Sequence, residues 1–172
     1  MTETLDSIEA QLGRKRNFDA PPLHLWHPEL SGDIPILIAS DGTWYHEDEP
    51  IRRESLVRLF ASILRREDDG EYYLVTPVEK WRLQVELHPL IVTDVEPAGD
   101  RLLLTLNTGK RLTVGEEHPL FLEPAVDNVA AVKLWHGLAA LFNRNAWYRL
   151  VELADDGFGV RSGEYSFVLN HD

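Results

Sequence analysis

Apolar and polar residues alternate along most of this chain, and two stretches instead follow helical spacing. Ile34, Ile36 and Ile38 alternate with other residues, as expected for a β-strand. Residues 52–65 carry an apolar stripe at the spacing of an amphipathic helix, formed by Leu56, Val57, Phe60, Ile63 and Leu64. Residues 145–154 also fit a helix better than a strand. The pattern predicts a strand-dominated α+β fold with one main helix in each half.

Turn residues and shorter apolar runs predict the remaining elements. Leu5, Ile8 and Leu12 predict a first helix that ends at Gly13, and residues 13–22 read as a linker. Asp41-Gly42 is the strongest hairpin turn, because primed turns need positive φ, which glycine adopts without strain. Extended or strand structure is predicted at residues 23–26, 43–46, 71–76, 78–95, 102–106, 112–114, 138–142 and 165–169.

The order of these elements repeats once. Residues 36–76 and 130–170 both run from an apolar strand through a glycine turn to a second strand, then a helix and another strand. The turns at Gly42 and Gly137 lie about 95 residues apart. This repetition predicts a tandem duplication, with an N-terminal helix and linker at 1–22 and β-rich domains at 23–86 and 87–172. An interface between like domains is a favoured ligand site.

Composition narrows the class of protein. Hydrophobic residues make up 44% of the 172 residues and charged residues 27%, which is ordinary for a soluble globular protein. The net charge of −12 argues against nucleic-acid polymers and anionic membranes as partners. The absence of cysteine excludes disulfides and thiolate chemistry. The N-terminus does not resemble a signal peptide, so we expect a cytoplasmic protein of bacterial type.

No catalytic motif is present, so we expect no catalytic residues, no cofactor and no enzyme activity. His46–Glu49 is a candidate cation site, but strand neighbours point apart, so a solvated turn is favoured. Glycines 157–163 precede a strand rather than a helix, which favours a β-turn over a phosphate loop. Glu79 beside Lys80 is the one acid–base pair that an enzyme hypothesis would use.

Positive charge concentrates in one segment of this acidic chain, at Arg52, Arg53, Arg58, Arg65, Arg66, Lys80 and Arg82. Arg53 lies in the first turn of the predicted helix, where unpaired N–H groups and the helix dipole favour an anion. Thr76 and Lys80 add a hydroxyl and a point charge, and Trp44 and Tyr45 are candidates to stack on a ring. The alternative is a solvated helix face with both aromatic residues in the core.

Four segments resemble a proteobacterial family known as domain of unknown function 1285. They are Leu25-Trp26 with Gly32-Asp33-Ile34, Asp41-Gly42-Thr43-Trp44, Pro50-Ile51 with Arg53, Leu56-Val57 and Leu59-Phe60, and Leu74 to Glu79. The resemblance implies tandem β-rich domains, the second similar to pleckstrin-homology folds. It also implies a nucleotide-like ligand between the domains, in signal transduction. The chain departs from the family pattern at Leu87–Leu90, at Trp135 and at Ser162–Tyr165.

The first functional hypothesis is therefore a sensor of an anionic, nucleotide-like small molecule, with a possible signalling partner. Its candidate ligand-binding residues are Trp44, Tyr45, Arg53, Thr76, Glu79 and Lys80 in the first half, and Asn107, Arg144 and Tyr148 in the second. The alternative is a protein-interaction module, whose acidic surface would select a basic partner or peptide. An enzyme of unknown class is the weakest hypothesis. No metal site is expected.

Overall fold

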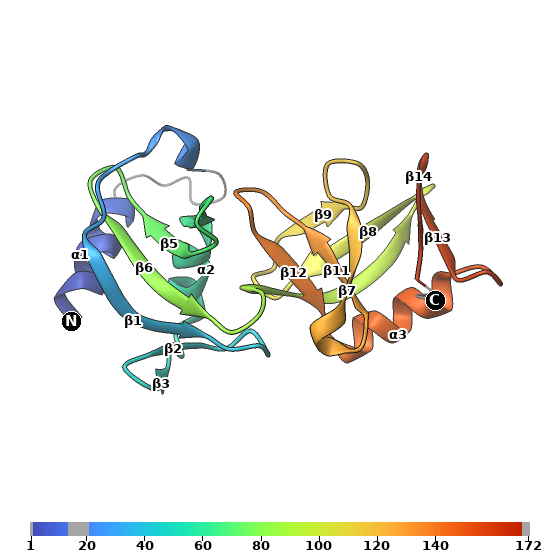
Figure 1. The fold of residues 1–172 in the computed structure, drawn as a ribbon, viewed down its shortest axis with the longest axis horizontal. Coiled ribbons are helices and arrows are strands. Elements are labelled where there is room, and N and C mark those ends of the chain that lie inside the picture. The colour runs from blue at the N-terminus through green and yellow to red at the C-terminus, as the bar shows by residue number, and fades with distance from the viewer. Residues whose placement is uncertain (1, 14–20, 170–172) are drawn as a thin grey trace. The chain divides into compact units, whose positions relative to one another are not determined.

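The computed structural model describes residues 2–13 and 21–169, and these divide into two compact units at residues 1–87 and 88–172 (Figure 1). The predicted boundary between residues 86 and 87 lies one residue from this division. Each unit is built on one six-stranded sheet. The predicted strand-dominated α+β fold with two tandem β-rich domains is confirmed, whereas the likeness to pleckstrin-homology folds stays a prediction.

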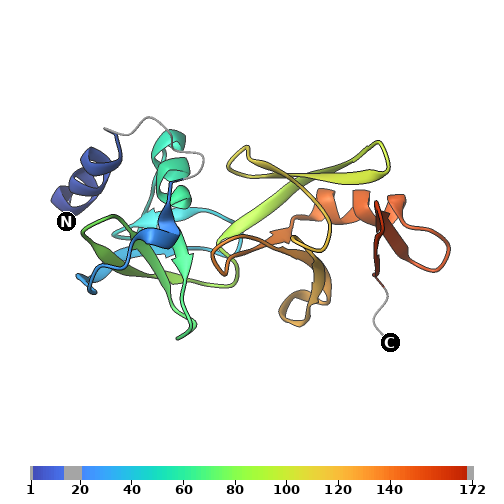
Figure 2. The same cartoon turned by 90° about the horizontal axis from the view of Figure 1, so that it is seen from above.

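The first unit combines a mixed sheet with two α-helices. Its elements are α1 (Thr2–Gly13), η1 (Leu23–Leu25), β1 (Gly32–Ile38), β2 (Trp44–His46), β3 (Glu49–Pro50), α2 (Glu54–Ser62), β4 (Leu64–Arg66), β5 (Tyr72–Val75) and β6 (Lys80–Val85). The strand order is β3-β2-β1-β6-β5-β4, and only the β1–β6 pair is parallel. Figure 2 shows α1 beside α2, against which it packs.

The second unit repeats this plan. Its elements are β7 (Leu90–Ala98), β8 (Arg101–Leu106), β9 (Arg111–Thr113), β10 (Leu120–Glu123), η2 (Pro124–Val126), β11 (Val129–Lys133), β12 (Ala139–Phe142), α3 (Arg144–Leu153), β13 (Gly159–Ser162) and β14 (Tyr165–Val168). The sheet order is β10-β11-β12-β7-β8-β9, and β7 and β12 form its parallel pair. Helix α3 packs on β7 and β12, and β13–β14 form a separate hairpin.

Both sheets therefore consist of two three-stranded meanders that join through a parallel pair of the first and last strands. This confirms the duplication but corrects its register. The strand equivalent to β1, which begins at residue 32, is β7, which begins at residue 90. The predicted repeat instead aligned the two helices. That alignment was wrong, because α2 lies between the third and fourth strands of its unit, whereas α3 follows the sixth.

Helix α2 is shorter than predicted. Phe60 of the predicted stripe is buried, as is Leu59 beside it, but the helix ends at Ser62, and Leu64 begins strand β4. Ile63 and Leu64 are fully buried, so they serve the core from the cap and the strand rather than from the helix. The apolar spacing therefore correctly predicts a buried face. The helix ends early because the residues that follow it, in β4, pair with β5.

In the N-terminal segment the predicted helix is confirmed, but the predicted extended stretch after it is not. Leu5 and Ile8 are buried on α1, as the helical spacing predicted. Residues 23–25, predicted as extended, form a short 3₁₀ turn with Leu23 buried. Most of the predicted linker lies outside the described residues. No helix of the described chain is long and apolar enough to cross a membrane.

Candidate functional site

The two neighbouring aromatic residues of β2 face opposite sides of the sheet, because successive side chains of a strand alternate. Trp44 is 1% exposed, and its ring centroid lies 6.5 Å from that of Phe60. Its buried indole N–H has no hydrogen-bond partner within the described residues. A ring with this burial offers no face to a ligand, so the structure places Trp44 in the core. Tyr45 is half-buried and lines a depression on the outer face of the sheet.

Arg53 is the residue that precedes α2, with extended backbone and no side-chain cap. Its guanidinium forms an ion pair with Glu9 of α1, and both side chains are substantially exposed. The carboxylate of α1 therefore occupies the place that the anion hypothesis gave to a ligand. The anion-binding role of Arg53 stays a prediction.

The turn after β5 uses its polar residues locally. The buried Thr76 hydroxyl accepts hydrogen bonds from the backbone N–H groups of Val78 and Glu79, at 3.3 and 2.9 Å. The Glu79 carboxylate accepts from the Gln11 side-chain amide and the Trp81 indole, at 3.2 and 3.3 Å. Through these hydrogen bonds, Thr76 and Glu79 stabilise the turn and its contacts with neighbouring elements. Their predicted ligand contacts stay predictions.

Lys80 belongs to a compact ion-pair network. Its ammonium lies 2.9 Å from Glu67 and 4.6 Å from the Tyr73 ring centroid, and Arg65 contacts the same carboxylate at 2.6 Å. Burial raises the pKa of the Glu67 carboxyl, but hydrogen bonds from Lys80 and Arg65 outweigh it and leave the pKa below its ordinary value. Two of the bases that the sequence concentrates here, Arg65 and Lys80, are thus paired with one acid of the same unit.

The three candidates of the second unit lie in two places. The Asn107 side chain accepts a hydrogen bond from the backbone N–H of Ile91 at 3.1 Å, which fixes the turn after β8. Arg144 and Tyr148 lie one helical turn apart on α3, and Tyr148 is 56% exposed. Their ligand-binding role stays a prediction, as does the ligand site between the two halves.

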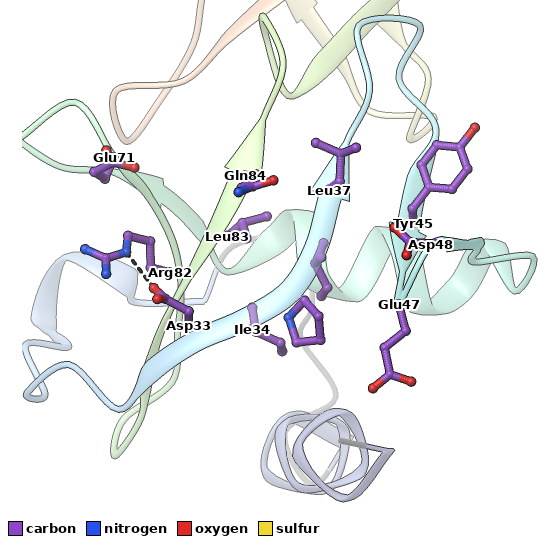
Figure 3. A pocket seen from close by; sticks show the side chains of 12 residues that line it. Asp33, Ile34, Leu37, Tyr45, Glu47, Asp48, Glu71, Arg82, Leu83 and Gln84 are labelled. Carbon is purple, nitrogen blue, oxygen red and sulfur yellow. Dashed lines mark hydrogen bonds and ion pairs between the residues drawn. The ribbon is translucent and has the colours of Figure 1, made fainter.

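The depression beside Tyr45 has a volume of about 570 Å³ and lies over β1, β2 and β6 (Figure 3). It coincides with a break in the parallel ladder, where β1 pairs with β6 at Asp33 and again at Leu37 but shifts register between them. Pro35 lies in this interval and has no N–H to donate to a ladder, which is why prolines in strands favour bulges. The bulge therefore opens the outer face of the sheet.

The charged lining of this depression is acidic. Four carboxylates, Asp33, Glu47, Asp48 and Glu71, accompany one guanidinium, Arg82, which lies 2.6 Å from Asp33 (Figure 3). The hydrogen bond from Arg82 holds the pKa of Asp33 below its ordinary value, and the same contact raises the pKa of Arg82. Both groups therefore remain charged at neutral pH. The remaining acids give the depression a net negative charge.

Between these charges lies an apolar strip. Leu37 and Tyr45 are directly opposed on β1 and β2 (Figure 3), and Pro35 also lines the depression. Glu47 and Asp48 form the following turn with φ of 52° and 69°, so the predicted solvated turn is confirmed. Within the described chain, no group of three or more acids and histidines could hold a metal ion.

Sequence reasoning missed most of this site. It noted Tyr45, but not that Asp33, Pro35, Leu37, Glu71, Arg82 and Gln84 share one depression. The available signal was Pro35 inside an otherwise regular strand pattern, since an interior proline points to a bulge or an edge.

Comparison with known proteins assigns the family. The N-terminal domain of the DUF1285 family, a domain of unknown function, matches residues 21–87, and its C-terminal domain matches residues 89–169. The chain belongs to the DUF1285 family. The DUF1285 match begins after α1, so this helix precedes the region that the family pattern covers. No curated protein matches the chain.

Two solved DUF1285 structures resemble it. A DUF1285 protein from Silicibacter pomeroyi DSS-3 is 38% identical, with a TM-score of 0.78, over 92% of this chain and 93% of that one. A DUF1285 protein from Shewanella baltica OS155 is 32% identical, with a TM-score of 0.60, over 69% of this chain and 91% of that one. Both likenesses extend the family assignment to the fold.

Proposed function

We propose that this protein is an interaction module, and that the depression of its first sheet binds a basic, extended segment of a partner protein. The observation that carries the proposal is the pairing of four carboxylates with an apolar strip at a break in the sheet. Opposite charges steer association and select partners, and the apolar strip adds contact area.

The ion pairs of the basic residues also favour a basic ligand over an anionic one. Arg53, Arg65, Lys80 and Arg82 each contact a carboxylate of their own unit. An anionic ligand at these four of the seven clustered bases would have to displace those carboxylates. A basic segment meets acids that are not already neutralised, since Arg82 is the single base in the depression and is paired with Asp33.

A titration with a short peptide of alternating Arg and apolar residues tests the proposal. The double variant Glu47→Gln/Asp48→Asn removes two charges from a turn with positive φ, which asparagine tolerates well. We expect it to weaken binding about tenfold, equivalent to about 1.4 kcal/mol. A matched variant, Glu29→Gln/Asp68→Asn, removes two exposed acids outside the depression.

Binding should also weaken steeply as salt increases, because the attraction is between exposed charges. Equal weakening in both double variants would mean that only net charge matters and would overturn the site. Failure of the wild-type protein to prefer the Arg peptide over a Gln-substituted counterpart would overturn the function.

A second candidate is the sensing of an anionic, nucleotide-like small molecule in signal transduction. It is supported by the family resemblance, and its candidate anion-binding group is the exposed Arg53 guanidinium, from which the ligand would displace the Glu9 carboxylate. A thermal-shift screen against nucleotides and sugar phosphates tests it, since a specific ligand raises the unfolding midpoint by mass action. A shift that persists unchanged in Arg53→Ala would remove Arg53 from that site. The cytoplasmic location stays a prediction.

A further inference from the structure

The two edges of the second sheet differ in how they are covered. Strand β10 forms one edge, and its Leu120 N–H donates to the Tyr165 hydroxyl of β14 at 2.9 Å. Strand β9 forms the other edge, and no strand of the described chain pairs with its outer side. An uncovered edge presents N–H and C=O groups that another chain can pair with.

The hydrogen-bond ladder shows which residues of β9 face outward. The N–H of Leu106 donates to the C=O of Lys110, and the N–H of Val114 donates to the C=O of Leu102. Backbone groups of successive residues in an antiparallel strand point alternately to the two sides. Arg111 and Thr113 lie between the inward-facing residues, so their backbone groups point away from β8.

A groove of about 950 Å³ follows this edge and includes every residue from Lys110 to His118. At one end, the Lys110 ammonium lies 4.2 Å from the centroid of the half-buried Trp135 ring, with His118 edge-on to that ring. At the other end, the buried Ser162 hydroxyl donates to the C=O of Val114 and accepts from the N–H of Leu102. The hairpin β13–β14 and the Trp135 cluster thus bound a groove along the strand.

We propose that this groove binds an extended peptide segment of a partner protein, which adds as a strand to β9. Backbone pairing with Arg111 and Thr113 would hold the peptide, and Trp135 would contact an apolar side chain. The charges of the groove are mixed, with Arg101, Lys110 and Arg111 alongside Asp100, Glu116, Glu117 and Glu164. This mixture fits a segment that carries both signs, unlike the basic segment proposed for the first sheet.

Two substitutions at one position isolate the backbone contribution. Thr113→Pro deletes an outward N–H, and proline is tolerated on edge strands where the N–H faces solvent. Thr113→Val keeps the N–H and changes only the hydroxyl. Trp135→Ala removes the proposed apolar contact and leaves the edge intact, so it tests the groove if the proline variant fails to fold.

The experiment is a selection of mixed-charge, unstructured peptides from a displayed library against the whole protein, followed by titration of the variants. We expect Thr113→Pro and Trp135→Ala each to lose about tenfold in affinity, and Thr113→Val to bind as wild type. Bound peptide should slow hydrogen exchange at the Arg111 and Thr113 amides.

Three results would overturn the proposal. They are the selection of no peptide, wild-type affinity in both Thr113→Pro and Trp135→Ala, and unchanged exchange at both amides. Concentration-dependent dimerisation of the wild type that Thr113→Pro abolishes would identify a second copy of the chain as the occupant instead.

Discussion

The two sheets share one strand order but open in different places. In the first sheet the parallel pair β1–β6 is broken between Asp33 and Leu37, and the break opens an acidic depression on the sheet face. In the second sheet the parallel pair β7–β12 runs in continuous register from Leu90 to Val92, and the groove lies along the edge strand β9. The shared strand order therefore does not decide where a sheet offers a binding surface. A local bulge decides it in the first sheet, and an uncovered edge decides it in the second.

The largest effect should separate two tryptophans that differ in burial. Trp44→Ala removes a ring that is 1% exposed in the first core, so we expect a loss of about 3–5 kcal/mol in the free energy of unfolding. Trp135→Ala removes a half-buried ring at the groove and should cost less, about 1 kcal/mol. Chemical denaturation of both variants measures the difference. Equal losses would contradict the assignment of Trp44 to the core and Trp135 to a surface groove.

The next effect concerns how the hairpin β13–β14 joins the second sheet. Ser162 is 2% exposed, and its hydroxyl bridges the N–H of Leu102 and the C=O of Val114. Ser162→Ala leaves both backbone groups without this partner and should cost about 1–3 kcal/mol. The matched first-unit variant Thr76→Val removes a buried hydroxyl that accepts two N–H groups and should cost a similar amount. A Ser162→Ala protein as stable as wild type in urea would mean that the hairpin is not tied to β8 and β9 through this residue.

Acid titration tests the ion-pair network of the first unit. The folded pKa of Glu67 is depressed, so its contribution is present above its ordinary pKa and is lost as pH falls through the lower, folded value. Glu67→Gln should therefore cost about 1 kcal/mol at neutral pH, and the gap to wild type should close on acidification below about pH 4. The exposed pair of Asp33 and Arg82 provides the control, because Asp33→Asn should leave stability unchanged. A difference in the free energy of unfolding between the two proteins that increased in acid would contradict the depressed pKa of Glu67.

The smallest effect should come from Arg53. Its pair with Glu9 is exposed on both sides, so Arg53→Ala should change the free energy of unfolding by less than about 0.5 kcal/mol. A large loss would show that α1 depends on this contact rather than on the buried Leu5 and Ile8. Thermal unfolding of the variant beside Ile8→Ala, which should be clearly destabilised, resolves the two contributions.

The elements of the fold were readable from local pattern. Alternating isoleucines predicted β1, apolar spacing predicted α1, α2 and α3, and Asp41-Gly42 predicted the hairpin turn, where Gly42 has φ of 90°. The register of the duplication was not readable, because the two helices occupy different positions in otherwise equivalent units. Helical periodicity reports a buried face, and it says nothing about which strands flank the helix.

The candidate site could be predicted less well from the sequence, because acids that are distant in the sequence pair with the basic residues. A run of basic residues indicates an anion site only if no acid of the same unit reaches it. Glu9 lies 44 residues before Arg53, Asp33 lies 49 before Arg82, and Glu67 lies 13 before Lys80. Such pairings depend on the tertiary fold. Pro35 itself indicates a bulge in β1. The sequence does not show that β6 lies beside this bulge and that a depression opens between them.

The most direct test of the central claim is the mapping of backbone amide shifts in the whole protein as the alternating Arg–apolar peptide is added. We expect the largest shifts at residues 33–37, 45, 47, 48 and 82–84, which line the depression. We also expect that the Glu47→Gln/Asp48→Asn variant reduces these shifts, whereas the Glu29→Gln/Asp68→Asn variant does not. Shifts spread evenly over the acidic surface, or centred elsewhere in the first unit, would contradict the central claim.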